Sequence, residues 1–200
     1  APGSMDSEAI AQRAAEAFLA EHIDLSAPGA SFKDFKLVSN HLGQNIRTLG
    51  YIQYKDGLEV LGGQVSFRFK NDRLFVIGSE ALPHVTVADA RQTISESKAK
   101  GIAQAWIIKE TGSTVSGAVV DGPFVLPLLK YNQTPEYATV MRVTLDAKKP
   151  VGKWEVFLDV KTGAEVAREQ KLMFVTSKIQ AITPDRWPGG ILVERPMETL

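Results

Sequence analysis

Residues 51–78 read YIQYKDGLEVLGGQVSFRFKNDRLFVIG, and this stretch decides the fold. Polar and apolar residues alternate from residue 64 to 70, which places Val65, Phe67 and Phe69 on one face of a strand. Asn71-Asp72 is a natural tight turn into a second apolar run at residues 74–77. The stretch therefore predicts a series of antiparallel strands, punctuated by turn residues at Asp56-Gly57 and Gly62-Gly63.

A helix is expected ahead of these strands. Residues 7–22 can be capped by Asp6 or Ser7, and apolar residues recur at helical spacing at Ile10, Ala14, Ala17 and Phe18. Ala27-Pro28-Gly29 breaks this pattern, and from residue 35 onward the period becomes two. The first part of the chain is thus expected to be a helix followed by an antiparallel meander.

The same order of elements returns after Leu82-Pro83, which is the best candidate for a domain boundary. A helix is expected from about Ser95 to Glu110, stopped by Thr111-Gly112. Its apolar side is predicted to hold Ile94, Ala99, Ile102, Ala105 and Trp106. Strands are expected at residues 124–129, 137–145, 153–160 and 165–174, with a hairpin turn at residues 159–163. The pattern favours an α+β fold of two related halves, each with a sheet curled around its helix.

Composition and charge are those of an ordinary soluble globular protein. Of 200 residues, 44% are hydrophobic and 23% charged, and the 23 basic residues balance the 23 acidic ones. Neither a nucleic acid nor an anionic membrane is favoured as a partner by a chain without net charge. The absence of cysteine excludes disulfides and thiolate chemistry. No stretch approaches the roughly 20 apolar residues that cross a bilayer, so membrane insertion is not expected.

No arrangement of catalytic or metal-binding residues stands out. His22, His41 and His84 lie far apart, and H-E-x-x-H, G-x-S-x-G and phosphate-binding loops are all absent. Glu155 and Asp159 would share a strand face about 13 Å apart, for which a solvated sheet face is a simpler explanation than a catalytic pair. We therefore expect no catalytic residue, no metal and no cofactor. A hydrolase would require the fold to join a histidine to a serine or carboxylate.

The last segment, residues 176–200, is rich in proline and glycine and reads as an extended tail or linker. It contains Asp185, Arg186 and Trp187 between two prolines, and these three are the candidate partner-binding residues. An aromatic side chain on an extended segment can anchor in a partner's groove. Trp187 could equally fold back as a plug on the chain's own sheet.

The first five residues, Ala1 to Met5, look like a vector remnant ahead of a cloned start, and we leave them out of the fold prediction. No basic region followed by an apolar one is visible, so a leader could have been removed in cloning.

Several of these stretches resemble a known family. Residues 51–65 are similar to a propeptide pattern of an aromatic, Gln, an x-Gly turn, a hydrophobic-x-hydrophobic step, Gly and Gln-Val. Residues 94–99 open a helix as PepSY domains do, and residues 140–143 and 152–166 resemble the two PepSY strands. Together they cover about residues 35–174. In this order and spacing they resemble the propeptide region, an FTP plus a PepSY domain, of thermolysin-type and fungalysin-type zinc metalloproteases.

The resemblance implies two cystatin-like halves, each a helix packed on a curled antiparallel sheet. An FTP-like domain would span residues 6–82 and a PepSY-like domain residues 83–175. It further implies a non-catalytic prosegment, secreted or periplasmic, that inhibits a zinc metalloprotease and assists its folding, with the cognate catalytic domain as partner in cis or in trans. No catalytic domain follows within these residues, which departs from the full family pattern. The alternative is a secreted binding or adhesion module that keeps the fold without a protease.

Overall fold

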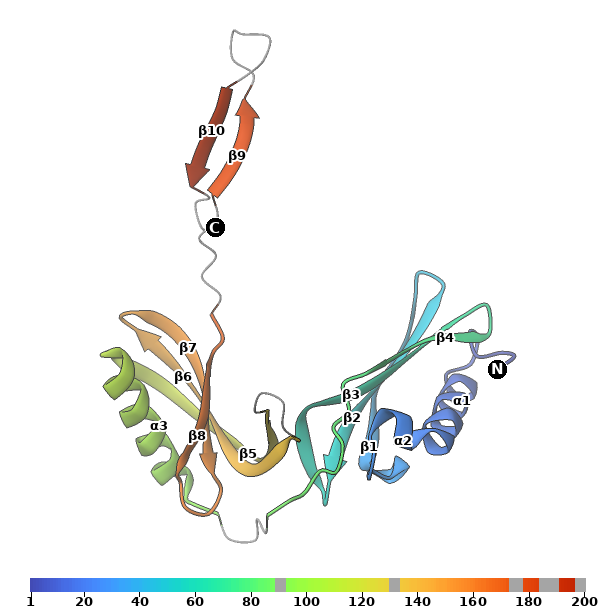
Figure 1. Cartoon of the computed structure of the whole chain (residues 1–200), viewed down its shortest axis with the longest axis horizontal. Coiled ribbons are helices and arrows are strands. Elements are labelled where there is room, and N and C mark those ends of the chain that lie inside the picture. The colour runs from blue at the N-terminus through green and yellow to red at the C-terminus, as the bar shows by residue number, and fades with distance from the viewer. Residues whose placement is uncertain (89–92, 130–133, 173–177, 184–190, 197–200) are drawn as a thin grey trace.

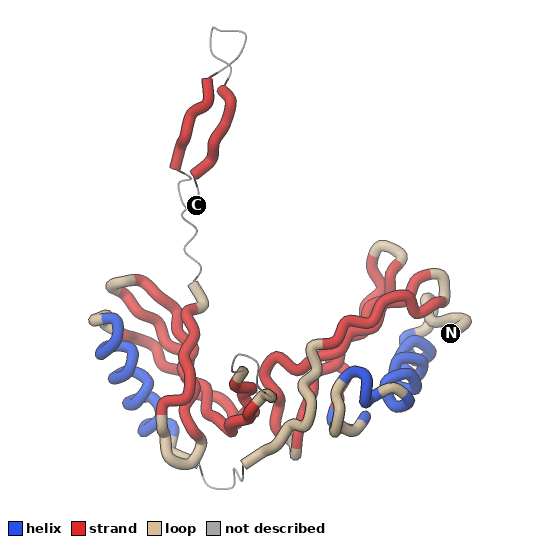
Figure 2. The backbone as a smooth tube through the Cα atoms, in the orientation of Figure 1, coloured by secondary structure: helices blue, strands red, loops and turns tan. Residues whose placement is uncertain are grey.

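The computed structural model describes residues 1–88, 93–129, 134–172, 178–183 and 191–196. Strands dominate the described part of the chain (Figures 1 and 2). The elements, in chain order, are α1 (Glu8–Glu21), α2 (Ile23–Ser26), a 3₁₀ turn η1 (Phe32–Asp34), β1 (Phe35–Gly43), β2 (Ile46–Lys55), β3 (Leu58–Lys70), β4 (Arg73–Ser79), α3 (Glu96–Thr111), β5 (Val115–Leu128), β6 (Glu136–Lys148), β7 (Val151–Asp159), β8 (Glu165–Gln170), β9 (Lys178–Thr183) and β10 (Ile191–Pro196).

Eight of the strands form a single mixed sheet in the order β1-β2-β3-β5-β6-β7-β8, with β4 paired to β3 beside this path. Neighbouring strands pair antiparallel except β3 and β5, which run parallel and meet at Val60 and Val125. The expectation of two cystatin-like halves, each with its own helix-covered sheet, is therefore wrong. The physical reason is the length of β3, which pairs with β2 near both of its ends and with β4 from Val65 onward, while Val60 also pairs with β5.

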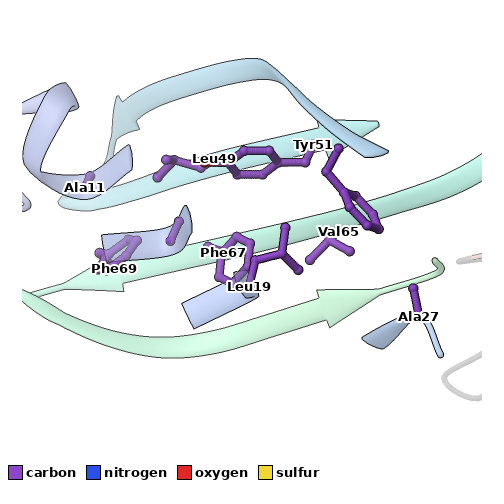
Figure 3. Close-up of a cluster of buried hydrophobic side chains, with 10 residues drawn as sticks. Ala11, Leu19, Ala27, Leu49, Tyr51, Val65, Phe67 and Phe69 are labelled. Atoms are coloured by element: carbon purple, nitrogen blue, oxygen red, sulfur yellow. The ribbon is translucent and has the colours of Figure 1, made fainter. Parts of the chain in front are cut away.

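The helix α1 covers the β2–β3 part of the sheet, and Figure 3 shows the cluster between them. Ser7 caps the helix by accepting a hydrogen bond from the Ile10 amide, one of the two predicted caps. The buried residues of α1 are Ala11, Ala15 and Leu19, one residue further along than the predicted stripe. Of that stripe, Ala14 and Phe18 are partly buried against the same cluster, and Ala17 is exposed. They pack on Leu49, Tyr51, Val65, Phe67 and Phe69. The last three are the strand face that the alternation of polar and apolar residues predicts.

The helix α3 covers the β5–β8 part in the same manner. Ser95 caps its first turn and Gly112, with φ of 67°, ends it in the left-handed conformation, as the sequence predicts. Its buried residues are Ala99, Ala103 and Ile107, whereas Ala105 of the predicted stripe is exposed. They pack on the apolar face of β6 and β7, which carries Val143, Leu145, Val156 and Leu158, and on Val160 just after β7.

The two covered parts of the sheet meet at a small third cluster. Val60, Val85 and Val125 are its buried residues. Gln53 is buried beside them. Its side-chain amide donates a hydrogen bond of 2.9 Å to the Leu82 carbonyl and accepts one of 2.8 Å from the Leu82 backbone amide. Residues 60–63 of β3 stand opposite Gln53 alone, so an extended irregularity bends β3 between its two stretches paired with β2, at the place where Val60 pairs with β5. Gly62-Gly63, predicted as a bend between strands, is part of this irregularity within one strand.

The first five residues pack on the fold. Met5 donates from its amide to the Asp72 carboxylate at 2.9 Å, and its carbonyl accepts two hydrogen bonds from the Arg47 guanidinium. Ser4 is fully buried. Hydrogen bonds from this segment hold the pKa of the Asp72 carboxyl below its usual value, the largest effect coming from the Gly3 backbone. The segment left out of the fold prediction therefore covers one edge of the α1 cluster.

The described residues of the tail form a hairpin, in which β9 and β10 pair antiparallel from Lys178↔Pro196 to Thr183↔Ile191. The proline and glycine content of the segment did not predict these strands. None of the helices within the described ranges has both the length and the apolar character needed to cross a membrane.

Candidate partner-binding surface

The strand β4 is an exposed edge of the sheet. Among the described residues it pairs with β3 and with no other strand, so the backbone groups along its outer side have no partner strand. Its three central residues, Phe75, Val76 and Ile77, are 49%, 38% and 37% exposed. A run of exposed apolar residues on an unpaired edge is a template for an additional strand.

The register of β3 and β4 sets which side chains share a face. Val76 lies opposite Arg68 and Leu74 opposite Phe69, so Phe75 is an extra residue at a β-bulge. Since opposed residues share a face, Val76 points away from α1 with Arg68, while Leu74 lies on the α1 side with Phe69. The edge therefore offers apolar side chains on both faces of the sheet.

Three basic side chains gather on the face opposite α1 near the β3–β4 turn. Arg68 and Lys70 alternate with the buried Phe67 and Phe69, and Arg73 lies opposite Lys70. All three are exposed, and none makes an ion pair or a side-chain hydrogen bond within the part of the chain that the structure describes. This end of the edge therefore carries unpaired positive charge.

An open hollow of about 260 Å³ lies on the same face, farther along β3 and β4. It is lined by Gln64, Ser66, Gly78, Ser79 and Glu80. The hollow exists because Gly78 lacks a side chain and the opposed Ser66 has a small one. Gln64 donates a hydrogen bond of 2.5 Å to Glu80, so the one carboxylate in the lining is engaged. The surface can accept a side chain or backbone there without enclosing a ligand.

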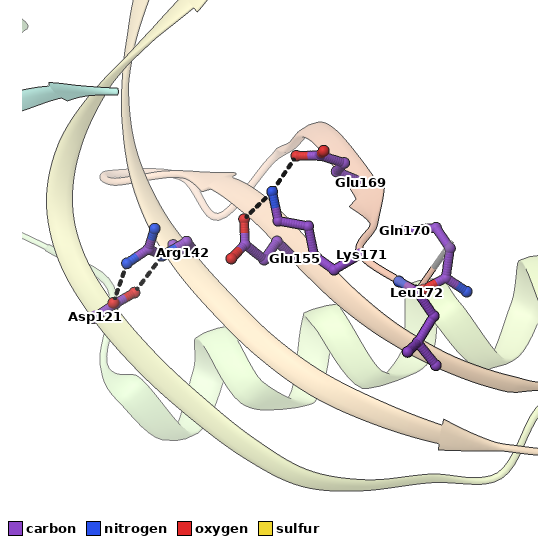
Figure 4. Close-up of polar contacts among 7 residues, drawn as sticks. All are labelled: Asp121, Arg142, Glu155, Glu169, Gln170, Lys171 and Leu172. Atoms are coloured by element: carbon purple, nitrogen blue, oxygen red, sulfur yellow. Dashed lines mark hydrogen bonds and ion pairs between the residues drawn. The ribbon is translucent and has the colours of Figure 1, made fainter. Parts of the chain in front are cut away.

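A second polar surface lies on the face of β5–β8 opposite α3, shown in Figure 4. Arg142 binds Asp121 through two hydrogen bonds of 3.0 and 2.6 Å, and its guanidinium lies 4.7 Å from the centre of the Phe124 ring. The bonds to Asp121 raise the pKa of Arg142, and Glu155 and Glu59 add to this effect through their charges. Lys171 bridges Glu155 and Glu169 at 3.4 and 2.9 Å. These groups are paired with one another, so this face is satisfied internally.

Two tryptophans hold an arginine on the α3 side. The Arg168 guanidinium lies 5.4 Å from the ring centre of Trp106 and 5.7 Å from that of Trp154, and it donates to Glu110 at 2.9 Å. The bond from Arg168 is the main cause of a lowered pKa of Glu110. Both tryptophans pack against the α3 cluster, and Trp106 does so in agreement with its predicted place on the apolar side of the helix.

The predicted partner-binding residues Asp185, Arg186 and Trp187 lie outside the described residues. The three histidines fall on separate elements: His22 follows α1, His41 is on β1 and His84 follows β4. Within the described residues no group of three or more His, Cys, Asp or Glu side chains is placed to hold a metal ion. The β4 edge was missed by sequence reasoning, because residues 74–77 predict a strand but not its position at the border of the sheet.

Comparison with known proteins gives a distant structural similarity. No protein-family model matches the sequence, and no curated protein matches it. Among solved structures, the C-terminal domain of YpeB from Bacillus megaterium is similar with a TM-score of 0.37 and 15% sequence identity. The similarity covers 82% of this chain and 65% of that one.

Proposed function

We propose that the chain is a non-catalytic prosegment, of the FTP plus PepSY type, that inhibits a secreted zinc metalloprotease and assists its folding. The observation that carries the proposal is the β4 edge, an exposed apolar strand border beside an open hollow. Such a border gives affinity through main-chain hydrogen bonds to a partner. The resemblance of residues 51–65 to the propeptide pattern and of residues 152–166 to a PepSY strand supports a protease as that partner.

The mechanism is one of selective binding. A surface that binds the native protease but not its unfolded chain stabilises the native state by mass action, by about 2.7 kcal/mol when the free chain is at a hundredfold excess over the Kd. Binding close to the protease cleft would also keep substrates out. Both activities use one interface and require no catalytic group on this chain.

The test mixes the purified chain with mature thermolysin and follows hydrolysis of a chromogenic peptide. We expect the initial rate to fall by more than half at micromolar excess of the chain. A gel of the same samples must show the chain uncut, since a competing substrate would also slow hydrolysis. In parallel, denatured thermolysin is refolded with and without the chain, and the recovered activity is expected to rise with it.

Unchanged hydrolysis together with unchanged refolding would remove the proposal for thermolysin-type enzymes. Complex formation on a sizing column without either effect would favour the alternative, a binding or adhesion module that keeps the fold without a protease. The exposed apolar run of β4 serves that alternative equally well, because it selects for a protein partner and not for a protease in particular.

A further inference from the structure

We propose that β4 binds an extended segment of the partner in which acidic and apolar residues alternate, adding a further strand to the sheet. The inference rests on the proposed partner-binding function and names the chemistry of the segment that the same surface takes. Backbone pairing is available because β4 is bonded on one side alone among the described residues.

The face opposite α1 selects acidic side chains. Arg68, Lys70 and Arg73 lie on it without ionic partners in the described structure. Glu80, at the other end of β4, already accepts a hydrogen bond from Gln64. Side chains of an added strand that point to this face lie next to Arg73 of β4, with Lys70 and Arg68 one strand farther away on β3. A carboxylate is therefore favoured near the β3–β4 turn, and a lysine is repelled there.

The face toward α1 selects apolar side chains. Ile77 lies opposite Phe67 and Leu74 opposite Phe69, so this face of β4 continues the apolar surface of the α1 cluster. Ile77 is 37% exposed at the end of that surface. Since successive residues of a strand point to opposite faces, an acidic residue on one face requires an apolar neighbour on the other. Alternation of the two types is the sequence that fits both faces.

A second copy of this chain fits the edge poorly. Two β4 edges paired in parallel would bring Arg73 of one copy next to Arg73 of the other, and like charges directly opposite each other oppose that pairing. The bulge at Phe75 also interrupts the regular strand that two identical edges would need. The bulge and, in parallel pairing, the charge of Arg73 therefore disfavour a second copy, and the edge remains open to an acidic segment.

The experiment uses three blocked synthetic peptides, each long enough to span β4, in which valine alternates with glutamate, with serine or with lysine. Binding to the whole chain is followed by fluorescence anisotropy, and the site by amide hydrogen exchange. We expect the glutamate peptide to bind best and to slow exchange in residues 73–79. Arg73→Glu should lower the affinity for the glutamate peptide by about two- to fivefold and raise the affinity for the lysine peptide. Arg13→Glu, the same charge change on the exposed side of α1, should alter neither.

Several results would overturn the inference: equal binding of the three peptides, binding of none, or protection confined to β1 or β8. Concentration-dependent dimerisation of the chain with protection of β4 would replace the acidic segment by a second copy. The peptide assay is independent of any protease. A chain that binds the glutamate peptide but leaves thermolysin unaffected would thus keep this inference and lose only the protease as partner.

Discussion

At the scale of single residues, the turn between β7 and β8 depends most on Asp159. One carboxylate oxygen, Oδ1, accepts hydrogen bonds from the amides of Lys161 and Thr162 and from the Thr162 hydroxyl, at 3.1, 2.7 and 2.7 Å. These bonds, those from Thr162 above all, hold the pKa of Asp159 below 3.8, its ordinary value. Ionised Asp159 therefore stabilises the fold above that pH, and its contribution disappears as the pH falls through the folded pKa.

We expect Asp159→Asn to retain the acceptor oxygen and lose the charge. The free energy of unfolding should fall by about 0.5–1 kcal/mol at neutral pH, the usual range for a hydrogen bond strengthened by charge at an exposed turn. Urea unfolding at neutral pH and well below pH 3.8 measures it, and the difference from the parent should shrink in acid. Asp24→Asn, at an exposed carboxylate without a hydrogen bond in the described residues, is the control. A difference that stays constant with pH would contradict the assignment.

At the scale of elements, two glycines differ in the space around them: Gly63 is packed closely against a neighbouring side chain, and Gly101 is not. A Cβ at Gly63 in β3 would lie 2.7 Å from Gln53 Oε1 and 2.9 Å from Gln53 Cβ. Gln53 cannot yield, because it is buried and its amide is fixed by Leu82 on both sides. A Cβ at Gly101 in α3 would meet no atom within 4 Å.

The same substitution is therefore expected to act in opposite directions at the two positions. Gly63→Ala should destabilise the protein by about 1–3 kcal/mol, as overpacking does. Gly101→Ala should stabilise it by about 0.5–1 kcal/mol, because alanine loses less backbone freedom in a helix. Chemical denaturation of both variants provides the measurement. Equal shifts in one direction would show that Gln53 moves aside and that β3 tolerates a side chain at its bend.

The elements that follow from local chemistry were predictable. Asn71-Asp72 forms the tight turn with φ of 49° and 59°, and Ser95 and Gly112 bound α3. The start of β5 was missed, because Gly117, Gly122 and Pro123 interrupt its pattern. The most buried line of α1 lies one residue further along than predicted, and in α3 Ala99 is buried as predicted while Ala105 is exposed, since alanine is compatible with either side of a helix. Local pattern thus fixes where an element lies better than which side of it is buried.

At the scale of the whole molecule, the sequence could not predict how the strands join. The parallel contact of Val60 with Val125 links residues far apart in the chain, and no local pattern marks it. The edge position of β4 follows from that pairing and was hidden for the same reason. In Figure 1 the helices α1 and α3 lie far apart, and the contact of Val60 with Val125 joins the parts of the sheet that they cover. The separate clusters under α1 and α3 are therefore joined through Val60, Val85 and Val125.

We expect the two large clusters to unfold together because the small cluster of Val60, Val85 and Val125, here called the junction, joins them. Val125→Ala removes two buried methyl groups, which costs about 2 kcal/mol, and we expect the loss to uncouple the two large clusters. Hydrogen exchange in rising denaturant should show β2 and β6 opening together in the parent and separately in the variant. Val119→Ala, on the same strand but 65% exposed, should leave them coupled. If β2 and β6 still open together in Val125→Ala, the sheet is held as one unit by contacts other than this junction.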